Sequence, residues 1–150
     1  MKTKKTVLVL LVIVFSVAGT FAQKISKKNV PSIIINSFHQ HFPRAYDVEW
    51  ELKNEMYKVE FETGLARYDH SVWYDKKGSM VKHREEISKR KLPEGVLLKL
   101  NSEYDKYRVS DVKKITENNK IIYSLELKWQ YEEWKMKIQP DGTVISKTQD

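Results

Sequence analysis

The chain has 150 residues, no cysteine and a formal net charge of +7, from 27 lysine and arginine against 20 aspartate and glutamate residues. The lack of cysteine excludes disulfides, thiolate zinc sites, cysteine nucleophiles and the attachment cysteine of a bacterial lipoprotein. Only five glycines are present, and no phosphate-binding glycine loop, serine elbow or His-Glu-x-x-His motif occurs, so the sequence gives no sign of a nucleotide or hydrolase site.

The first 22 residues predict a cleaved signal peptide. Lysines lie within residues 2–5, residues 7–18 are apolar, and small residues at the end of this segment place the cleavage between Ala22 and Gln23. An uncleaved membrane anchor is the alternative, although the apolar run is short for a bilayer. Loss of three lysines leaves 24 basic and 20 acidic residues, a net charge of +4. We therefore expect a periplasmic or secreted protein that binds no nucleic acid and, once cleaved, no membrane.

Much of the remaining chain consists of an internal sequence repeat. The pattern of residues 29–51 returns in residues 91–114, with Phe38 and Phe42 answered 62 residues later by Leu100 and Tyr104. A second match pairs "YKVEF" at 57–61 with "YSLEL" at 123–127. Such duplication predicts two similar units, a first repeat over residues 23–88 and a second over residues 89–150.

Each copy is predicted to begin with a helix that follows a proline, Pro31 or Pro93. In the first copy Ile34, Phe38 and Phe42 form one apolar stripe, and Pro43 ends the helix.

Strands with alternating apolar and polar residues follow each helix, at 48–53, 57–62 and up to Tyr74 in the first copy, and at 123–129 and 134–138 in the second. This parity assigns Val48, Trp50, Trp129 and Trp134 to the core. The fold class that we expect is α+β, with two tandem repeats, each a helix packed on a three- to four-stranded antiparallel sheet. The polar segment 82–91 is interpreted as a strand end that runs into the linker.

The motifs of the first copy, residues 38–43, 45–51, 57–61 and 72–78, resemble the β-lactamase-inhibitor-like (BLIP-like), PepSY-like proteins that bacteria export. The second copy departs from the pattern, because Asp105 stands where the helix-ending proline would be. The resemblance implies tandem helix-plus-sheet units, a location outside the cytoplasm, and no known catalysis or cofactor.

The histidines of "FHQHFP" invite a metal-site interpretation that the duplication argues against. His39 and His41 are two residues apart, so on a helix they point to different sides. Their counterparts in the second copy are Asn101 and Glu103, so the fold needs no histidine there. We expect no metal site at this helix end, and the alternating carboxylates of the strands read as a solvated sheet face rather than a hydrolase pair.

Trp73 is the more informative residue, since the parity of its strand points it to the polar face of the sheet. Exposed there, its indole offers a large apolar anchor to a partner, whereas a β-bulge or cover by the linker would make it structural. The candidate binding residues are Trp73, Lys58, Glu60, Arg67 and Asp69.

These observations favour a non-enzymatic, exported binding module of the cell envelope that recognises a protein or peptide, inhibitor-like recognition being one special case. The alternative is a periplasmic protein that senses a small molecule or metal through histidines and carboxylates. An enzyme is the third hypothesis, without any motif in its favour.

Overall fold

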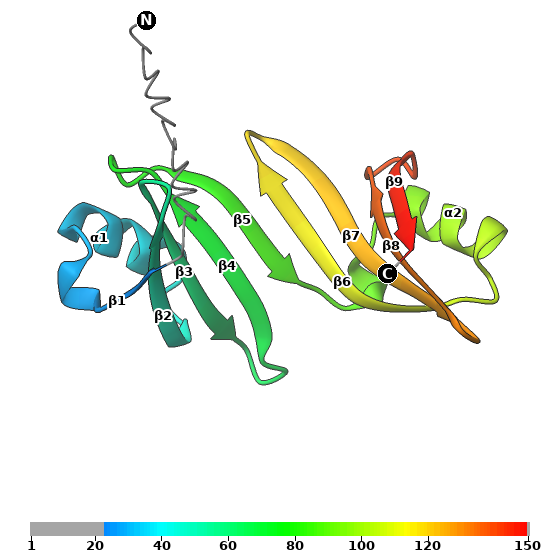
Figure 1. Ribbon diagram of the computed structural model, residues 1–150, viewed down its shortest axis with the longest axis horizontal. Helices are drawn as coiled ribbons and strands as arrows, with labels where there is room; N and C mark the ends of the chain where they lie inside the picture. The colour runs from blue at the N-terminus through cyan, green and yellow to red at the C-terminus, as the bar shows by residue number, and fades with distance from the viewer. Residues whose placement is uncertain (1–22, 150) are drawn as a thin grey trace, which may run out of the picture.

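The computed structural model describes residues 23–149, so the expected signal peptide and its cleavage after Ala22 lie outside the described residues. Within these residues, two short helices and nine strands follow one another (Figure 1). The strands are β1 (Gln23–Ile25), β2 (Tyr46–Lys53), β3 (Met56–Thr63), β4 (Tyr68–Tyr74), β5 (Met80–Glu86), β6 (Arg108–Glu117), β7 (Lys120–Trp129), β8 (Glu132–Ile138) and β9 (Val144–Gln149). Helix α1 spans Ser32–His41 and α2 spans Glu94–Glu103, each preceded by a short 3-10 turn, Lys27–Asn29 or Lys89–Lys91.

All nine strands form one antiparallel sheet in the order of the chain, β1 to β9. The expected α+β fold of two separate helix-on-sheet units is therefore wrong, and the described chain is mostly a single sheet with two short helices. Figure 1 shows the sheet running across the whole molecule, with α1 at one end and α2 at the other. The duplication itself is present, because each half repeats the order of a 3-10 turn, a helix and a run of strands.

The two repeats share a strand, which is why two sheets become one. β5 pairs with β4 of the first repeat and, along its other edge, with β6 of the second repeat. In the first repeat β1 pairs with the edge of β2, and in the second repeat Glu85 and Glu86 of β5 pair with the edge of β6 in the same way. Both β1 and β5 are followed by the start of a 3-10 turn, reached through the sequence Ile-Ser-Lys in each repeat. Of the segment 82–91 that was interpreted as a strand end and linker, residues 82–86 thus belong to a central strand shared by both repeats, and Lys89–Lys91 form the 3-10 turn before α2.

Two separate hydrophobic cores lie on one face of this sheet. In the first, Ile34 and Phe38 of α1 pack on Trp50, Val59 and Val72. The second contains Val96 and Leu100 of α2 with core residues of β6 to β8, namely Val112, Tyr123, Leu125, Leu127, Met136 and Ile138. Cross-strand partners share a face of a sheet, and one row of partners runs Phe61, His70, Glu85, Lys114, Tyr123 and Ile138. Both helices therefore cover the same face, and polar residues lie between the two cores.

Two residues that were assigned to the core by parity lie elsewhere. Val48 is 38% exposed and lies in a bulge of β2 between Tyr46 and Glu49, whereas Val112, in the corresponding bulge of β6, is 5% exposed. Trp129 is 36% exposed at the end of β7, where its ring contacts Tyr107 and not the core. Trp50 and Trp134 meet the expectation, the first within its core and the second packed against it.

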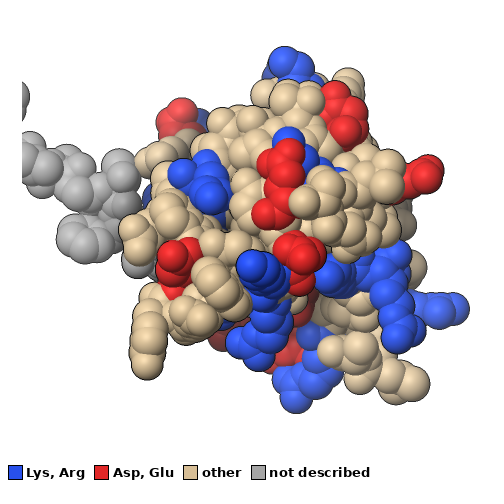
Figure 2. Space-filling model, turned by 90° about the vertical axis from the view of Figure 1, so that its right-hand side faces the viewer, with Lys and Arg blue, Asp and Glu red and all other residues tan. Residues whose placement is uncertain are grey.

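The surface charges are mixed in sign. Figure 2, which views the molecule from the end formed by the second repeat, shows lysine and arginine side chains beside aspartate and glutamate. No helix among the described residues is long and apolar enough to cross a membrane.

Candidate functional site

The face of the sheet opposite the helices carries the residues that the sequence singled out. Antiparallel pairing places Lys58, Trp73 and Lys82 in one row across β3, β4 and β5. The next row holds Glu60, Ser71 and Arg84, and a third begins with Glu62 and Asp69. We call this surface the polar face; its central residues are Glu51, Lys58, Glu60, Glu62, Asp69, Ser71, Trp73, Lys82 and Arg84.

Trp73 lies half-buried among three cations of the polar face. The Nζ atoms of Lys58 and Lys82 are 5.7 and 5.4 Å from the centroid of its ring, and Cζ of Arg84 is 5.9 Å from it. Each such contact is worth about 0.5–1 kcal/mol at a partly exposed site. The register has a bulge after Trp73, but Trp73 itself keeps its pairing with Lys58 and Lys82, so the indole stays on the polar face as parity predicted.

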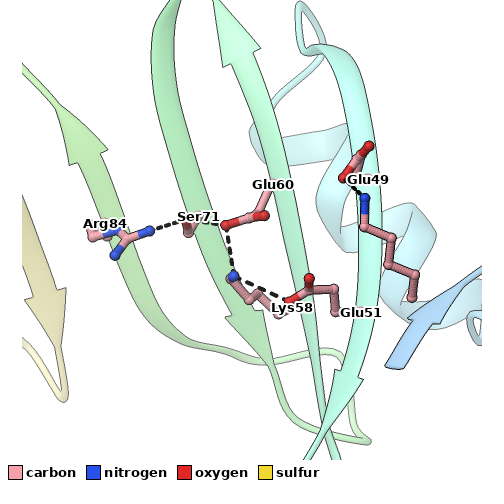
Figure 3. Close-up of polar contacts among 7 residues, drawn as sticks. Glu49, Glu51, Lys58, Glu60, Ser71 and Arg84 are labelled. Carbon is pink, nitrogen blue, oxygen red and sulfur yellow. Dashed lines mark hydrogen bonds and ion pairs between the residues drawn. The ribbon is translucent and has the colours of Figure 1, made fainter. Parts of the chain in front are cut away.

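A chain of polar contacts crosses this face from β2 to β5 (Figure 3). Lys58 bridges two carboxylates, with its Nζ 3.2 Å from Glu51 and 2.7 Å from Glu60. The hydroxyl of Ser71 donates to Glu60 and accepts a 2.9 Å hydrogen bond from Arg84. The Lys58 side chain is only 17% exposed, so this ion pair is partly desolvated and holds its geometry better than a surface pair.

The pKa of Glu60 is lowered by its neighbours. Burial alone would raise it, but the hydrogen bond and charge of Lys58, the hydroxyl of Ser71 and the charge of Arg84 together outweigh burial. Glu60 is therefore ionised at neutral pH, and the face presents a fixed pattern of charges.

A shallow hollow of about 320 Å³ opens on the polar face beside Arg84. Carboxylates dominate its lining, with Arg84 and Lys113 as its cations; the acidic residues are Asp47, Glu49, Glu60, Glu62, Asp69 and Glu86. Lys113 is paired with Asp111 at 2.7 Å, whereas no ion pair within 4.0 Å joins Arg84 to a carboxylate in the described part of the chain. The guanidinium thus retains donors for a ligand that enters the hollow.

Four of the five predicted binding residues, Trp73, Lys58, Glu60 and Asp69, come together on the polar face. Arg67 lies in the hairpin loop at its margin, where it forms a two-pronged ion pair with Glu62 at 2.6 and 2.8 Å. That pair lowers the pKa of Glu62 through the Arg67 hydrogen bond. The sequence missed Lys82 and Arg84, because their segment was interpreted as a strand end; a register for β5 would have placed them beside Trp73.

The face continues into the second repeat with apolar side chains. Arg84 pairs across to Ile115, and Ile115 pairs with Ile122. Both isoleucines are partly exposed. The surface therefore carries an aromatic side chain in the first repeat and two aliphatic side chains in the second, with Lys82 and Arg84 between them.

The histidines occupy two different places. In α1, Nδ1 of His41 lies 2.7 Å from the carbonyl oxygen of Ser37, and Nε2 of His39 lies 3.2 Å from Nζ of Lys27, so the two rings have separate neighbours. His70 and His83 instead lie on the helix-covered face, where burial lowers the pKa of His70 and lowers that of His83 to about 4. The sequence did not single out this second pair, because the two residues are 13 positions apart and meet only through the β4–β5 register.

Comparison with known proteins gives one family. The family model described as "Putative beta-lactamase-inhibitor-like, PepSY-like" matches residues 20–82 and again residues 55–146, which agrees with two repeats. No curated protein matches the chain.

Solved structures share the architecture at low sequence identity. A DUF2874 family protein from Bacteroides uniformis ATCC 8492 is 18% identical, with a TM-score of 0.67 over 79% of this chain and 88% of that one. A protein from Bacteroides eggerthii DSM 20697, described as one of the "putative periplasmic proteins", is 16% identical, with a TM-score of 0.67 over 80% and 88%. A BLIP-like protein from Bacteroides fragilis NCTC 9343 is 19% identical, with a TM-score of 0.64 over 79% and 85%. At these identities the likeness shows the fold alone.

Proposed function

The chain belongs to the β-lactamase-inhibitor-like, PepSY-like family, and we propose that it is a non-enzymatic, exported binding module that recognises a protein or peptide in the cell envelope. The family description names likeness to an inhibitor and no catalytic activity. The periplasmic description of one structural neighbour and the signal peptide expected at residues 1–22 support the envelope location.

The observation that carries the proposal is the ordered surroundings of Trp73. Three cations hold its indole, and the Glu51–Lys58–Glu60 bridge fixes two of the neighbouring charges. A side chain that is already fixed loses little rotamer freedom when a partner binds, and tryptophan is one of the residue types enriched among the residues that dominate binding energy at protein interfaces. The carboxylates and lysines around it form the polar rim that such an anchor needs.

The test is recovery of envelope proteins on immobilised wild-type protein and on Trp73→Ala. The matched control is Trp129→Ala, because Trp129 is also partly exposed and also has a lysine over its ring, Lys106 at 5.8 Å, but lies in the second repeat. We expect Trp73→Ala to lose a partner that wild type and Trp129→Ala both retain. Equal recovery of every partner by all three proteins would contradict a role for Trp73.

A further inference from the structure

Two histidines and a glutamate converge on the helix-covered face between the two cores. Nδ1 of His70 lies 3.0 Å from Nε2 of His83. One ligand atom from each of His70, His83 and Glu85 lies within 4.8 Å of the other two. His70 and Glu85 are direct partners across β4 and β5, and His83 precedes Glu85 by two residues on the same face, so regular strand geometry holds the three side chains together.

We propose that His70, His83 and Glu85 form a binding site for a divalent transition-metal ion of the zinc class. Two imidazoles and one carboxylate are a ligand set that zinc uses where its fourth position stays open to water. Zinc–ligand bonds of about 2.0–2.2 Å at tetrahedral angles separate neighbouring ligand atoms by roughly 3.3–3.6 Å. The two nitrogens are close to that separation, and rotation of the Glu85 side chain brings its carboxylate the remaining distance.

The histidine rings have the support that metal ligands need. Oγ1 of Thr63 lies 2.7 Å from Nε2 of His70; when the ring donates this hydrogen bond, Nδ1 keeps its lone pair for a metal. The His70 ring also stacks on Phe61, with centroids 4.9 Å apart and planes 5° apart. The ring of Phe42 meets His83 edge-on at 5.3 Å. These contacts hold the two rings end to end, with the two nitrogens facing one another across the hydrogen bond, so each ring must turn for both lone pairs to converge on an ion.

Metal binding exchanges two contacts of the metal-free protein. The His70–His83 hydrogen bond gives way to two metal–nitrogen bonds, and the proton between the rings moves to the other nitrogen of His83. Lys114 binds Oε1 of Glu85 at 3.1 Å, so its ammonium competes with a cation for this carboxylate. Lys114 thus weakens the site, which gives a directional test.

The second repeat is an internal control. The β4–β5 and β8–β9 registers place Trp134, Lys147 and Gln149 where the first repeat has His70, His83 and Glu85. There the lysine ammonium lies 4.4 Å from the centroid of the tryptophan ring and 5.2 Å from that of Tyr104, the counterpart of Phe42. The fold fills the same position with a cation–π pair, so packing does not require two imidazoles and a carboxylate.

The experiment is titration of the metal-free protein with zinc by calorimetry and with cobalt by visible absorption. We expect one ion per chain, a cobalt spectrum of low coordination number, and a melting temperature that rises with zinc. Thr63→Val should weaken zinc binding by about 10- to 100-fold, the usual effect of a lost supporting partner. His83→Gln and Glu85→Gln remove ligands and should each weaken it at least as much, whereas Lys114→Gln should bind zinc several-fold tighter.

The matched control replaces both helix histidines by their second-repeat counterparts, His39→Asn with His41→Glu. This double variant should bind zinc as the wild type does. Glu85→Gln keeps the test valid if His83→Gln fails to fold, because glutamine already occupies the equivalent position 149. Absence of zinc heat and of cobalt absorption in the wild type would overturn the proposal, as would unchanged affinity in His83→Gln and Glu85→Gln. The zinc titration does not depend on whether Trp73→Ala loses a partner in the pull-down, so each proposal can be refuted without the other.

Discussion

Phe38→Ala tests whether the two hydrophobic cores are energetically separate. Phe38 is 1% exposed, and its ring packs against Trp50 at 5.4 Å and against Phe61 at 5.1 Å, both edge-on. Truncation of a buried phenylalanine costs about 3–5 kcal/mol through lost transfer free energy and the cavity left behind. This cost should fall in the first core, because the two cores share no buried residue and the residues of the shared strand that pair with β6, residues 82–86, are all polar.

Native-state hydrogen exchange measures this cost strand by strand. In Phe38→Ala the amides of Val59 and Val72 should lose about 3–5 kcal/mol of protection, and those of Leu125 and Leu127 should keep most of theirs. The mirror variant Leu100→Ala, at 2% exposure in the second core, should reverse the pattern at a cost of about 2–5 kcal/mol. Equal loss of protection in both repeats, with one cooperative transition in each variant, would refute the reasoning and show that the shared strand couples the cores fully.

Two further predictions concern the polar face and the second helix. The folded pKa of Glu60 lies below its ordinary value of 4.5, so its contribution to stability is complete above about pH 4.5 and is lost as the pH falls through the folded pKa. In urea denaturation, the difference in unfolding free energy between wild type and Glu60→Gln should shrink from pH 6 to pH 3. A difference that stays constant over this range would contradict the lowered pKa. Gly95→Ala should destabilise the protein by about 1–3 kcal/mol although alanine favours helix, because the added Cβ would lie 2.7 Å from the backbone carbonyl of Asp141. Thermal unfolding should show no such loss for the control Asn101→Ala, an exposed position of the same helix. A Gly95→Ala protein more stable than the wild type would refute the clash.

The sequence predicted the features that depend on local chemistry. The asparagines of Asn54-Glu55 and Asn118-Asn119 are typical of turns, and each pair has positive φ at both residues, as a tight hairpin between twisted strands requires. The parity of Trp73 was also right, because alternation in a regular strand depends only on the strand itself. Parity did not predict the exposure of Val48, which lies in a β-bulge, although Val112 in the matching bulge of β6 is buried in the core.

The features that the sequence did not reveal depend on pairing between distant segments. Lys82 and Arg84 join Trp73, and His83 joins His70, only once the register of β4 against β5 is known. Nothing in the composition of residues 82–86 fixes that register, since the segment has no apolar residue to mark a buried side. The candidate site was therefore half predicted, with its residues on β3 and β4 and without those on β5.

The polar character of β5 follows from its place in the sheet. A strand shows apolar alternation where a helix covers one of its faces, and the two cores lie to either side of β5. Lys82 and Arg84 therefore point to the polar face, and His83 and Glu85 point to the gap between the cores. One strand thus supplies side chains to the proposed protein-binding surface and to the proposed metal site, on opposite faces and at alternate positions. In a chain made of two repeats, a polar segment between them is therefore a candidate for a shared central strand as well as for a linker.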